Sequence, residues 1–352
     1  MQRRLFKRVL LAGALIGAAL VVAGPLWGAD RNAYTVTNLV SNGAVPAKFT
    51  DASLVNPWGL VAGPTTPFWV ADNGANISTL YAGDGTKNAA VHPTVDGGPT
   101  GVVFNGTSGV FLLPSGATAR FIFASEDGKI RGWAGGLTAA VVTASGASGA
   151  KYKGLAIDPT AGHLRLYATD FHNGRVDVWD GAWNLVSTST TFVDPALPAG
   201  YAPFGIQNVN GRIFVTYAKQ DEEASDDLHG QGLGIVDAFD TDGNLLARVA
   251  QHGQLDAPWG LAWAPDTFGR FGGDLLVGNF GNGEINAYAE LPNGHFEHRG
   301  RLSAGNGAPL AIDGLWALQF GNGLATAPAG RLFFTAGPND EHDGLFGSID
   351  AG

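Results

Sequence analysis

Apolar and polar positions repeat in a fixed order along this chain. Each repeat starts with a glycine followed by an aliphatic residue, and short apolar runs that end in small polar clusters come next. The glycines are Gly59, Gly101, Gly154, Gly205, Gly260 and Gly314, with spacings of 42, 53, 51, 55 and 54 residues. Spacings of this size are typical of propeller blades rather than of helical solenoids. The pattern therefore predicts six blades.

Short apolar runs supply the strands of each blade. In the first repeat we expect an inner strand from residue 59, a second strand at 68–71, a third at 77–81 and a fourth near 91–95. The later second strands are expected at 121–124, 164–168, 213–216, 275–278 and 332–335. Such β-branched and aromatic runs favour buried strands. The third strands carry aromatic residues that should fill the space between blades: Tyr81, Trp133, Trp179, Phe239 and Tyr288.

The last repeat lacks a fourth strand. Its third apolar run, at about 346–349, is followed by only a few residues, whereas a β-like run at 34–40 precedes the first glycine and belongs to no repeat. Placing that run beside the last blade would close the ring and remove exposed sheet edges. The sequence thus predicts an all-β, six-bladed β-propeller over residues 30–352, closed by an N-terminal strand that completes the last blade.

Residues 1–29 differ from the rest of the chain. A basic stretch at 3–8 precedes an apolar run at 9–26, which is the pattern of an export signal. We expect cleavage of residues 1–29 and a periplasmic or extracellular protein. The apolar run is also long enough for an uncleaved membrane anchor, the one membrane contact we expect.

Composition excludes some partners and chemistries. Four of the 21 basic residues lie in the leader, which leaves 21 − 4 = 17 basic residues against 31 acidic residues in the remaining domain. That domain is therefore strongly acidic. Nucleic acid is therefore not an expected partner. The chain has no cysteine, which excludes thiolate catalysis and Cys-ligated zinc.

Several motifs carry a family resemblance. They are Asn56-Pro57-Trp58-Gly59-Leu60, Ala71-Asp72-Asn73-Gly74 and the stretches 217–221, 232–234 and 337–347. With these motifs the chain resembles NHL-type and gluconolactonase-like six-bladed propellers. More narrowly, it resembles an uncharacterised family of exported bacterial propellers, some of which end in a PEP-CTERM sorting tail. The resemblance implies the fold and export but no established activity. No such tail follows Ala351 and Gly352, so sorting by that route is not expected.

Oxygen-bearing residues close several second strands. The six closing residues are Asp72, Ser125, Asp170, Tyr217, Asn279 and Ala336. Asp72, Asp170 and Asn279 offer oxygens that suit a divalent metal such as calcium. The alternative is that these three side chains cap their own turns.

The gluconolactonase resemblance implies a divalent cation at the channel mouth that polarises a lactone carbonyl. In those enzymes an asparagine before an anchor glycine helps to hold the cation. The matching positions here include Trp58, Phe204 and Trp259, and no blade has the asparagine. This departure weakens the metal-lactonase interpretation.

Candidate ligand-binding residues precede the anchor glycines, on the face where second strands end. The set we select is Trp58, Lys153, Phe204, Trp259 and Asp313. Aromatic faces can stack on sugar rings or planar ligands, and the lysine and aspartate add charge. The alternative is that the aromatic side chains simply plug the channel.

Histidines near the same face are the candidate catalytic residues. His229 and His342 each stand shortly before a glycine in the charged loops 220–229 and 339–343, and His172 occupies the corresponding loop of the third blade. Histidines from separate blades that face one axis would suit metal binding or acid–base chemistry. Solvated surface loops are the alternative.

Three functions stay open. We favour an exported propeller that binds a small organic or carbohydrate-like ligand at the channel mouth, with a divalent metal as an additional component. The alternatives are a metal-assisted hydrolase or lyase of the lactonase type, and a scaffold whose acidic loop binds a protein partner. Motifs of serine hydrolases, zincins and NTPases are absent from the sequence. Whether the protein is an enzyme stays open, because propellers host all these roles.

Overall fold

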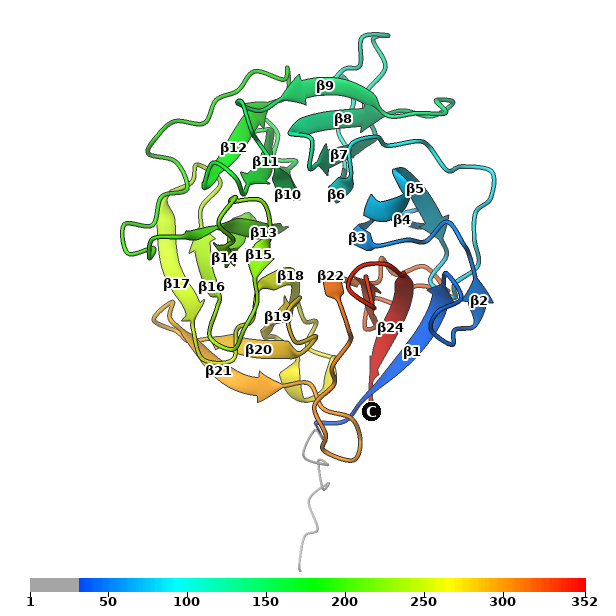
Figure 1. Ribbon diagram of the computed structural model, residues 1–352, viewed down its shortest axis with the longest axis vertical. Helices are drawn as coiled ribbons and strands as arrows, with labels where there is room; N and C mark the ends of the chain where they lie inside the picture. The colour runs from blue at the N-terminus through cyan, green and yellow to red at the C-terminus, as the bar shows by residue number, and fades with distance from the viewer. Residues whose placement is uncertain (1–31) are drawn as a thin grey trace, which may run out of the picture. The chain divides into compact units, whose positions relative to one another are not determined.

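The computed structural model describes residues 32–352, so the expected leader at 1–29 lies outside the described residues. Residues 32–352 form six sheets arranged in a ring (Figure 1). Each inner strand contacts the next, and the last contacts the first. The inner strands are β3 (Pro57–Ala62), β6 (Pro99–Phe104), β10 (Tyr152–Asp158), β13 (Tyr201–Val209), β18 (Pro258–Trp263) and β22 (Leu315–Phe320). The predicted six-bladed propeller is confirmed.

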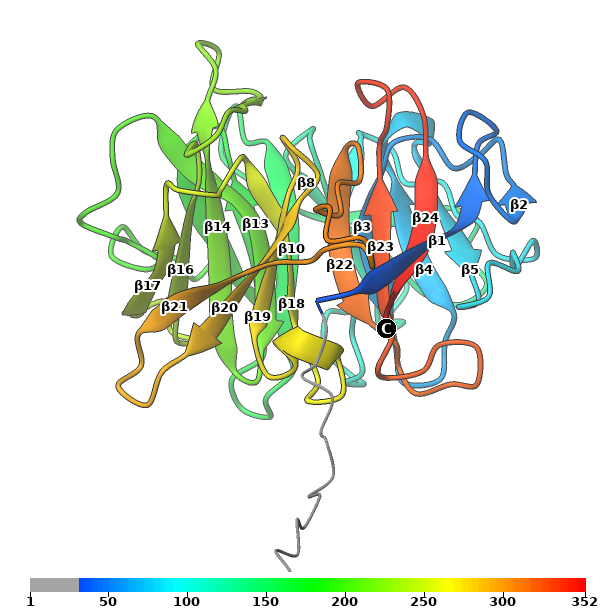
Figure 2. The same ribbon diagram turned by 90° about the horizontal axis from the view of Figure 1, so that it is seen from below.

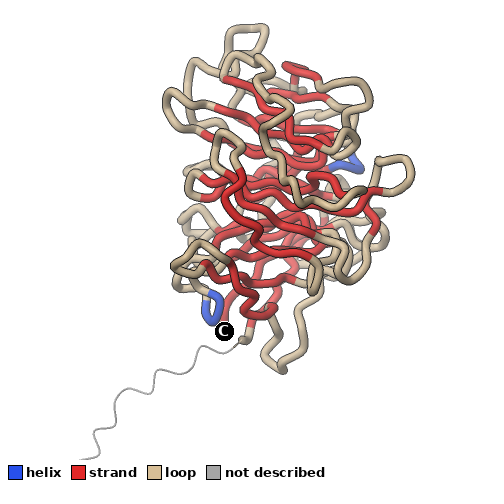
Figure 3. The backbone as a smooth tube through the Cα atoms, turned by 90° about the vertical axis from the view of Figure 1, so that its left-hand side faces the viewer, coloured by secondary structure: helices blue, strands red, loops and turns tan. Residues whose placement is uncertain are grey.

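The second and third strands follow the predicted apolar runs closely. The second strands are β4 (Phe68–Asp72), β7 (Phe121–Ser125), β11 (Arg165–Asp170), β14 (Arg212–Gln220), β19 (Leu275–Asn279) and β23 (Leu332–Ala336). The third strands are β5 (Ile77–Tyr81), β8 (Lys129–Trp133), β12 (Arg175–Asp180), β16 (Ile235–Phe239), β20 (Ile285–Glu290) and β24 (Leu345–Ala351). Seen from the side, these strands run between two faces formed by loops (Figures 2 and 3).

Outer strands are less regular. The fourth strands are β9 (Val141–Ser145), β17 (Leu245–Gln251) and β21 (Phe296–Arg301), and a short β15 (Asp227–Leu228) pairs with β14. The segment predicted as a fourth strand near 91–95 lies beside β5 as expected but forms no regular strand, because its pairing is limited to isolated bridges of Thr94 with Ile77 and with Ala139. Pro93 has no N–H to donate, which interrupts a ladder at this point. Two single 3₁₀ turns, η1 (Asn73–Ala75) and η2 (Gly269–Phe271), are the helical elements of residues 32–352, and no helix in that range could cross a membrane.

Ring closure occurs as predicted. Strand β1 (Tyr34–Ser41) pairs antiparallel with β24, from Tyr34 opposite Ala351 to Ser41 opposite Leu345. A two-residue strand, β2 (Phe49–Thr50), then pairs with β1. The last blade is therefore built from both ends of the described chain, and its sheet has no free edge at β24.

Apolar clusters fill the spaces between blades. The third-strand aromatic residues expected there, Tyr81, Trp133, Trp179, Phe239 and Tyr288, are all buried. Between the first two blades, for example, Trp69 stacks on Phe121 with ring centroids 3.8 Å apart. These aromatic residues are core, as predicted.

The repeated glycine marks the closest approach of neighbouring inner strands. A Cβ at any of five anchors would lie within 3.0 Å of a backbone atom in the inner strand of the next blade: Gly59, Gly101, Gly154, Gly205 and Gly260. At Gly59, for instance, the nearest such atom is the Thr100 carbonyl oxygen, 2.5 Å away. Only glycine fits without separating the strands.

The sixth anchor lies three residues later than predicted. Leu315 pairs with Ala336 as Pro57 pairs with Asp72, so Trp316 and Ala317 hold the positions of Trp58 and Gly59. The assignment of Gly314 as the sixth anchor is therefore wrong. Gly314 lies in a turn instead, with φ 64°.

Candidate functional site

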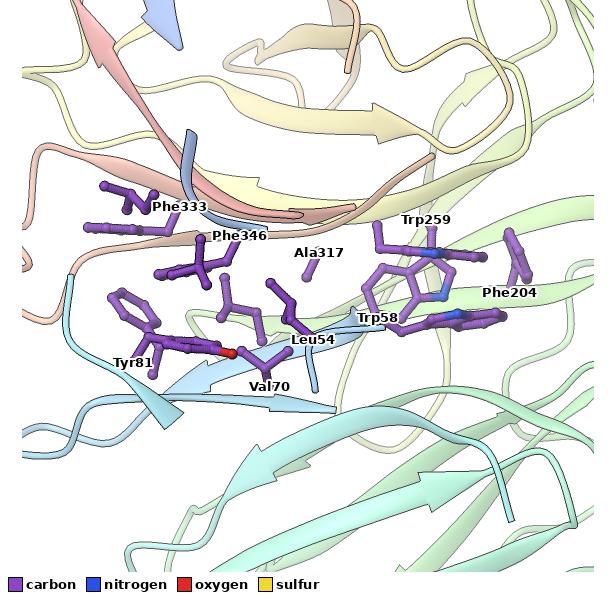
Figure 4. Close-up of a cluster of buried hydrophobic side chains, with 14 of the residues drawn as sticks. Leu54, Trp58, Val70, Tyr81, Phe204, Trp259, Ala317, Phe333 and Phe346 are labelled. Atoms are coloured by element: carbon purple, nitrogen blue, oxygen red, sulfur yellow. The ribbon is translucent and has the colours of Figure 1, made fainter. Parts of the chain in front are cut away.

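Four aromatic side chains close the channel on the face where inner strands begin. We call this set the aromatic plug: Trp58, Phe204, Trp259 and Trp316. Trp58 stacks on Trp316 with ring centroids 3.6 Å apart, and Trp259 and Phe204 pack edge-on against these two rings. Figure 4 shows Trp58, Phe204 and Trp259 lying together. All four are at most 9% exposed. The plugging arrangement considered for Trp58, Phe204 and Trp259 is what the geometry shows, while ligand stacking on these rings stays a prediction.

A buried lysine lies over the plug. The Lys153 side chain is 1% exposed, and its Nζ lies 5.1 Å from the centre of the Trp58 ring. Its Nζ donates to Glu126 Oε1 at 2.6 Å and to Asp226 Oδ1 at 2.8 Å. Burial opposes the charged form, but these two carboxylates outweigh it and raise the pKa of Lys153. Lys153 starts the third blade, whereas Glu126 follows β7 and Asp226 lies in the loop after β14, so three blades meet at one ammonium.

The sixth blade adds a carboxyl group, that of Glu341, to the charged side chains around Lys153. Glu341 Oε2 accepts a hydrogen bond from Asn56 Nδ2 at 3.2 Å, and Asn56 Oδ1 accepts one from Trp316 Nε1 at 3.1 Å. Burial, together with Glu126 and the loop aspartates, raises the pKa of Glu341 to about 7, although Lys153 acts in the opposite direction. A carboxyl with a pKa near neutrality suits a role in proton transfer.

Backbone strain accompanies this placement of Glu341. Three consecutive non-glycine residues, Asn339, Asp340 and Glu341, have φ angles of 58°, 50° and 64°, and Asn56 has φ 43°. Left-handed backbone is unfavourable for residues with a Cβ, and strain of this kind clusters at functional sites. The loop is thus held in a costly conformation that brings Glu341 to the plug.

We expect Glu341 to make stability fall as pH rises. Its pKa is raised from 4.5, so its contribution to the unfolding free energy is fully present below pH 4.5 and is lost as pH rises through about 7. Glu341→Gln should remove this loss, so at pH 8 it should unfold at a higher urea concentration than the wild type. Its unfolding free energy at that pH should be larger by on the order of 2 kcal/mol. Below pH 4.5 the two proteins should unfold alike. Glu297→Gln, on the exposed face of β21, is the control. An equal pH profile for the wild type and Glu341→Gln would contradict this assignment.

One polar atom of the plug has no partner. Trp58 Nε1 is buried and makes no hydrogen bond within residues 32–352. Buried donors are normally paired with protein, water or ligand. Trp58 thus offers an unused donor beneath Lys153.

The three predicted metal ligands each have their own hydrogen-bond partners. Asp72 accepts from the Thr79 N–H at 2.8 Å, while Asp170 accepts from Asn173 Nδ2 at 2.7 Å. Asn279 donates to the Gln254 carbonyl at 2.8 Å. Only Asp170 clearly caps its own turn, because it also accepts from the Asn173 N–H at 3.2 Å. Asp72 bonds across to β5, and Asn279 bonds to the segment that precedes β18.

These three residues share no hydrogen-bond partner. Burial raises the pKa of Asp72 and of Asp170. Across residues 32–352 no group of three or more His, Asp or Glu side chains is placed to hold a metal ion. A joint metal site remains a prediction.

The predicted histidines have separate surroundings. His172 Nδ1 lies 3.2 Å from the Ala224 carbonyl, in the acidic loop, and His342 is exposed within its own turn. His229 Nδ1 lies 3.5 Å from Asp227 Oδ2, and this carboxylate raises the pKa of His229. No contact between these histidines brings them into one catalytic set.

The remaining predicted ligand residue is at the surface. Asp313 is exposed, and its carboxylate accepts a hydrogen bond from the Asn339 N–H at 3.0 Å. It therefore supports the strained loop rather than the plug. The corrected register gives the corresponding position in the plug to Trp316.

The fold and the site define the class of this protein as a six-bladed β-propeller whose channel is plugged by aromatic residues beneath a buried charge cluster. No protein-family model matches the chain. It is 31% identical over 339 residues to uncharacterized protein R648 of Acanthamoeba polyphaga mimivirus, covering 90% of this chain and 80% of that protein. Uncharacterized protein L690 of the same virus is 31% identical over 341 residues, covering 90% and 85%. The chain belongs to the family of these two proteins. A bacterial source stays a prediction.

Solved structures with the same fold are more distant. Virginiamycin B lyase from Staphylococcus aureus has a TM-score of 0.52 and 13% identity, covering 90% of this chain and 99% of that one. Soluble aldose sugar dehydrogenase from Escherichia coli has a TM-score of 0.56 and 14% identity, covering 91% and 100%. A Bacteroides thetaiotaomicron protein of unknown function has a TM-score of 0.57 and 12% identity, covering 90% and 76%. At these identities the likeness shows the fold alone.

Proposed function

We propose that the protein binds a small ligand at the channel mouth, in contact with Lys153 and the carboxylates around it. We define the channel mouth as the face above the aromatic plug that carries Glu126, Lys153, Asp226 and Glu341. The observation that carries the proposal is the buried Lys153 ammonium, which is held between acidic side chains from different blades. Buried ion pairs contribute little net stability, which favours a role in binding for this one.

The excess of carboxylates at the mouth favours ligands that carry hydrogen-bond donors or positive charge. Glu126, Asp226, Asp227 and Glu341 all act on one another or on Lys153, so acceptors outnumber the one ammonium. A ligand that supplies donors, such as an amine or a molecule rich in hydroxyl groups, would satisfy this excess. Carbohydrate-like ligands fit this description, and a protein of the same fold is named for its action on aldose sugars.

Binding assays with a matched pair of variants test the proposal. Spermidine, glucose and calcium chloride are the probes, titrated by calorimetry. Asp226→Asn and Asp242→Asn each remove one exposed carboxylate, 72% and 71% exposed, but only Asp226 contacts Lys153. At least one probe should bind the wild type and Asp242→Asn equally and should bind Asp226→Asn at least tenfold more weakly. Equal weakening in both variants, or no binding of any probe, would contradict the proposal.

Calcium among the probes distinguishes the metal-assisted alternative. Stoichiometric calcium in the purified protein, with a lower melting temperature after chelator, would support a divalent cation at the mouth. Binding of spermidine or glucose that chelator leaves unchanged would support a metal-free site.

Catalysis by Glu341 is the second candidate function. A carboxyl with a pKa of about 7 beside an ammonium suits general acid–base chemistry, as a hydrolase or lyase requires. If Glu341→Gln abolished turnover of a ligand but still bound it, the protein would be an enzyme rather than a binding protein alone.

Export is a further part of the proposal. It rests on the basic and apolar pattern of residues 1–29. N-terminal sequencing of the protein recovered outside the cytoplasm would show whether the leader is removed.

A further inference from the structure

Aliphatic residues of all six inner strands form a ring below the aromatic plug, which we call the aliphatic ring. One residue after each anchor position contributes to the ring: Leu60, Val102, Leu155, Ile206, Leu261 and Leu318. They surround a cavity of about 30 Å³ that reaches Trp259 of the plug. A cavity of this size holds about one water molecule. The plug therefore ends the channel on the side of the mouth.

On the opposite face the channel opens into a funnel. Two adjacent hollows of about 200 Å³ and 380 Å³ share Gln207, Asn208 and Gln319. The later residues of all six inner strands line them, including Ala62 of β3. Because inner strands run away from the plug, these hollows form one funnel with its closed end at the aliphatic ring. Its combined size is that of a drug-sized ligand.

The chemistry of the funnel differs from that of the mouth. No charged side chain lines the cavity or either hollow. Half-buried aromatic side chains, Phe104, Trp263 and Phe320, form part of its wall. A charged ligand would lose its hydration here without gaining a partner, whereas a neutral one would bury apolar surface.

One amide is available at the centre of the funnel. Gln207 lines the cavity and both hollows, and its side chain makes no hydrogen bond to residues 32–352. Its neighbour Asn208, by contrast, is held by bonds to the Ile157 carbonyl and the Gly211 N–H. Gln207 can therefore both donate to and accept from a bound molecule.

We propose that this funnel is a second ligand site, separate from the mouth, for a neutral molecule with an apolar body and a carbonyl, amide or hydroxyl group that bonds to Gln207. The apolar body contacts the aliphatic ring and the aromatic wall. The aromatic plug keeps such a ligand from reaching Lys153, so the two sites bind independently.

Nile red, a neutral fluorophore with an apolar body and one carbonyl, is the probe. The wild type should bind one equivalent with an emission shift to the blue. Gln207→Glu places a charge in the funnel and should weaken binding at least tenfold, whereas Gln254→Glu adds the same charge at an exposed position on the mouth side and should change binding less than twofold. Asp226→Asn should also leave Nile red binding unchanged.

A variant that fills the funnel makes the test independent of charge. Ala62 is half-buried and lines the smaller hollow, so the larger side chain of Ala62→Trp would occupy part of that space. It should abolish one-to-one binding while circular dichroism and the melting temperature confirm folding. The absence of saturable Nile red binding to the wild type would overturn the proposal. Binding by Gln207→Glu and Ala62→Trp that is as tight as binding by the wild type would also overturn it.

Discussion

Replacing Gly205 with alanine is expected to lower the unfolding free energy by about 3 kcal/mol or more. An alanine Cβ would overlap the Trp259 carbonyl oxygen on the neighbouring inner strand and would lie 2.9 Å from Thr216 Oγ1. The same hydroxyl accepts the Gly205 N–H at 2.8 Å, so the side chain cannot move away without losing that bond. The strands β13 and β18 would have to separate. Because the ring is closed, that displacement would strain every other blade contact.

Equilibrium urea unfolding followed by circular dichroism measures this effect. Gly135→Ala is the matched control, because a Cβ at Gly135 meets nothing within 4 Å and its φ is not in the left-handed region. The control should shift stability by less than about 0.5 kcal/mol. Similar midpoints for the two variants would show that the close approach at the axis does not explain the glycine repeat.

Lys153→Met should have the second-largest effect, on both stability and binding. Methionine keeps an unbranched apolar chain over Trp58 but removes the charge, so Glu126 and Glu341 lose the nearest cation. Breaking a buried pair typically costs about 3–5 kcal/mol, and we expect about 2–4 because Asp226 is largely exposed. The pKa of Glu341 should rise further, because Lys153 lowers it in the wild type. Ligand binding at the mouth should be lost.

A double-mutant cycle separates the charge from general damage. Glu126→Gln in the Lys153→Met background removes one uncompensated carboxylate and should recover part of the lost stability. Lys129→Met removes a half-exposed lysine that lies 3.4 Å from Asp127 and should cost less than about 1 kcal/mol. If Glu126→Gln destabilised both backgrounds equally, the two side chains would not be coupled and the proposed cluster would be wrong.

The fold could be predicted from the sequence because each blade repeats a local requirement. At five of the six anchors, glycine is required because the next inner strand comes too close for a Cβ, and the apolar runs follow each anchor directly. The sixth register was predicted wrongly because Ala317 stands where glycine was expected, while Gly314 and Leu315 imitate the pattern three residues earlier. A turn glycine and an anchor glycine look alike in sequence, and strand pairing alone distinguishes them.

The site could be predicted only in part. Lys153 was selected from the sequence as a ligand-binding residue, and the structure places it over the aromatic plug, while ligand binding there stays a prediction. The loops that carry Asp226 and Glu341 were noted for their charge. Glu126, Asn56 and Trp316 were missed, because their roles depend on which side chains of separate blades meet. The left-handed turn that carries Glu341 has only a weak signal in residue type, since asparagine and aspartate tolerate such backbone but glutamate does not favour it.

The pairing of β1 with β24 also governs the order of assembly. Strand β1 leaves the ribosome before any blade exists, yet its partner is among the last residues to follow. Until then the first strand has no ladder to join and the sixth blade lacks its outer layer. Closure is thus a late step that depends on contacts between residues about 300 positions apart, which makes folding slow and leaves unpaired edges exposed meanwhile. Circular permutation that joined the neighbouring ends and opened the chain elsewhere would turn this long-range step into a local hairpin.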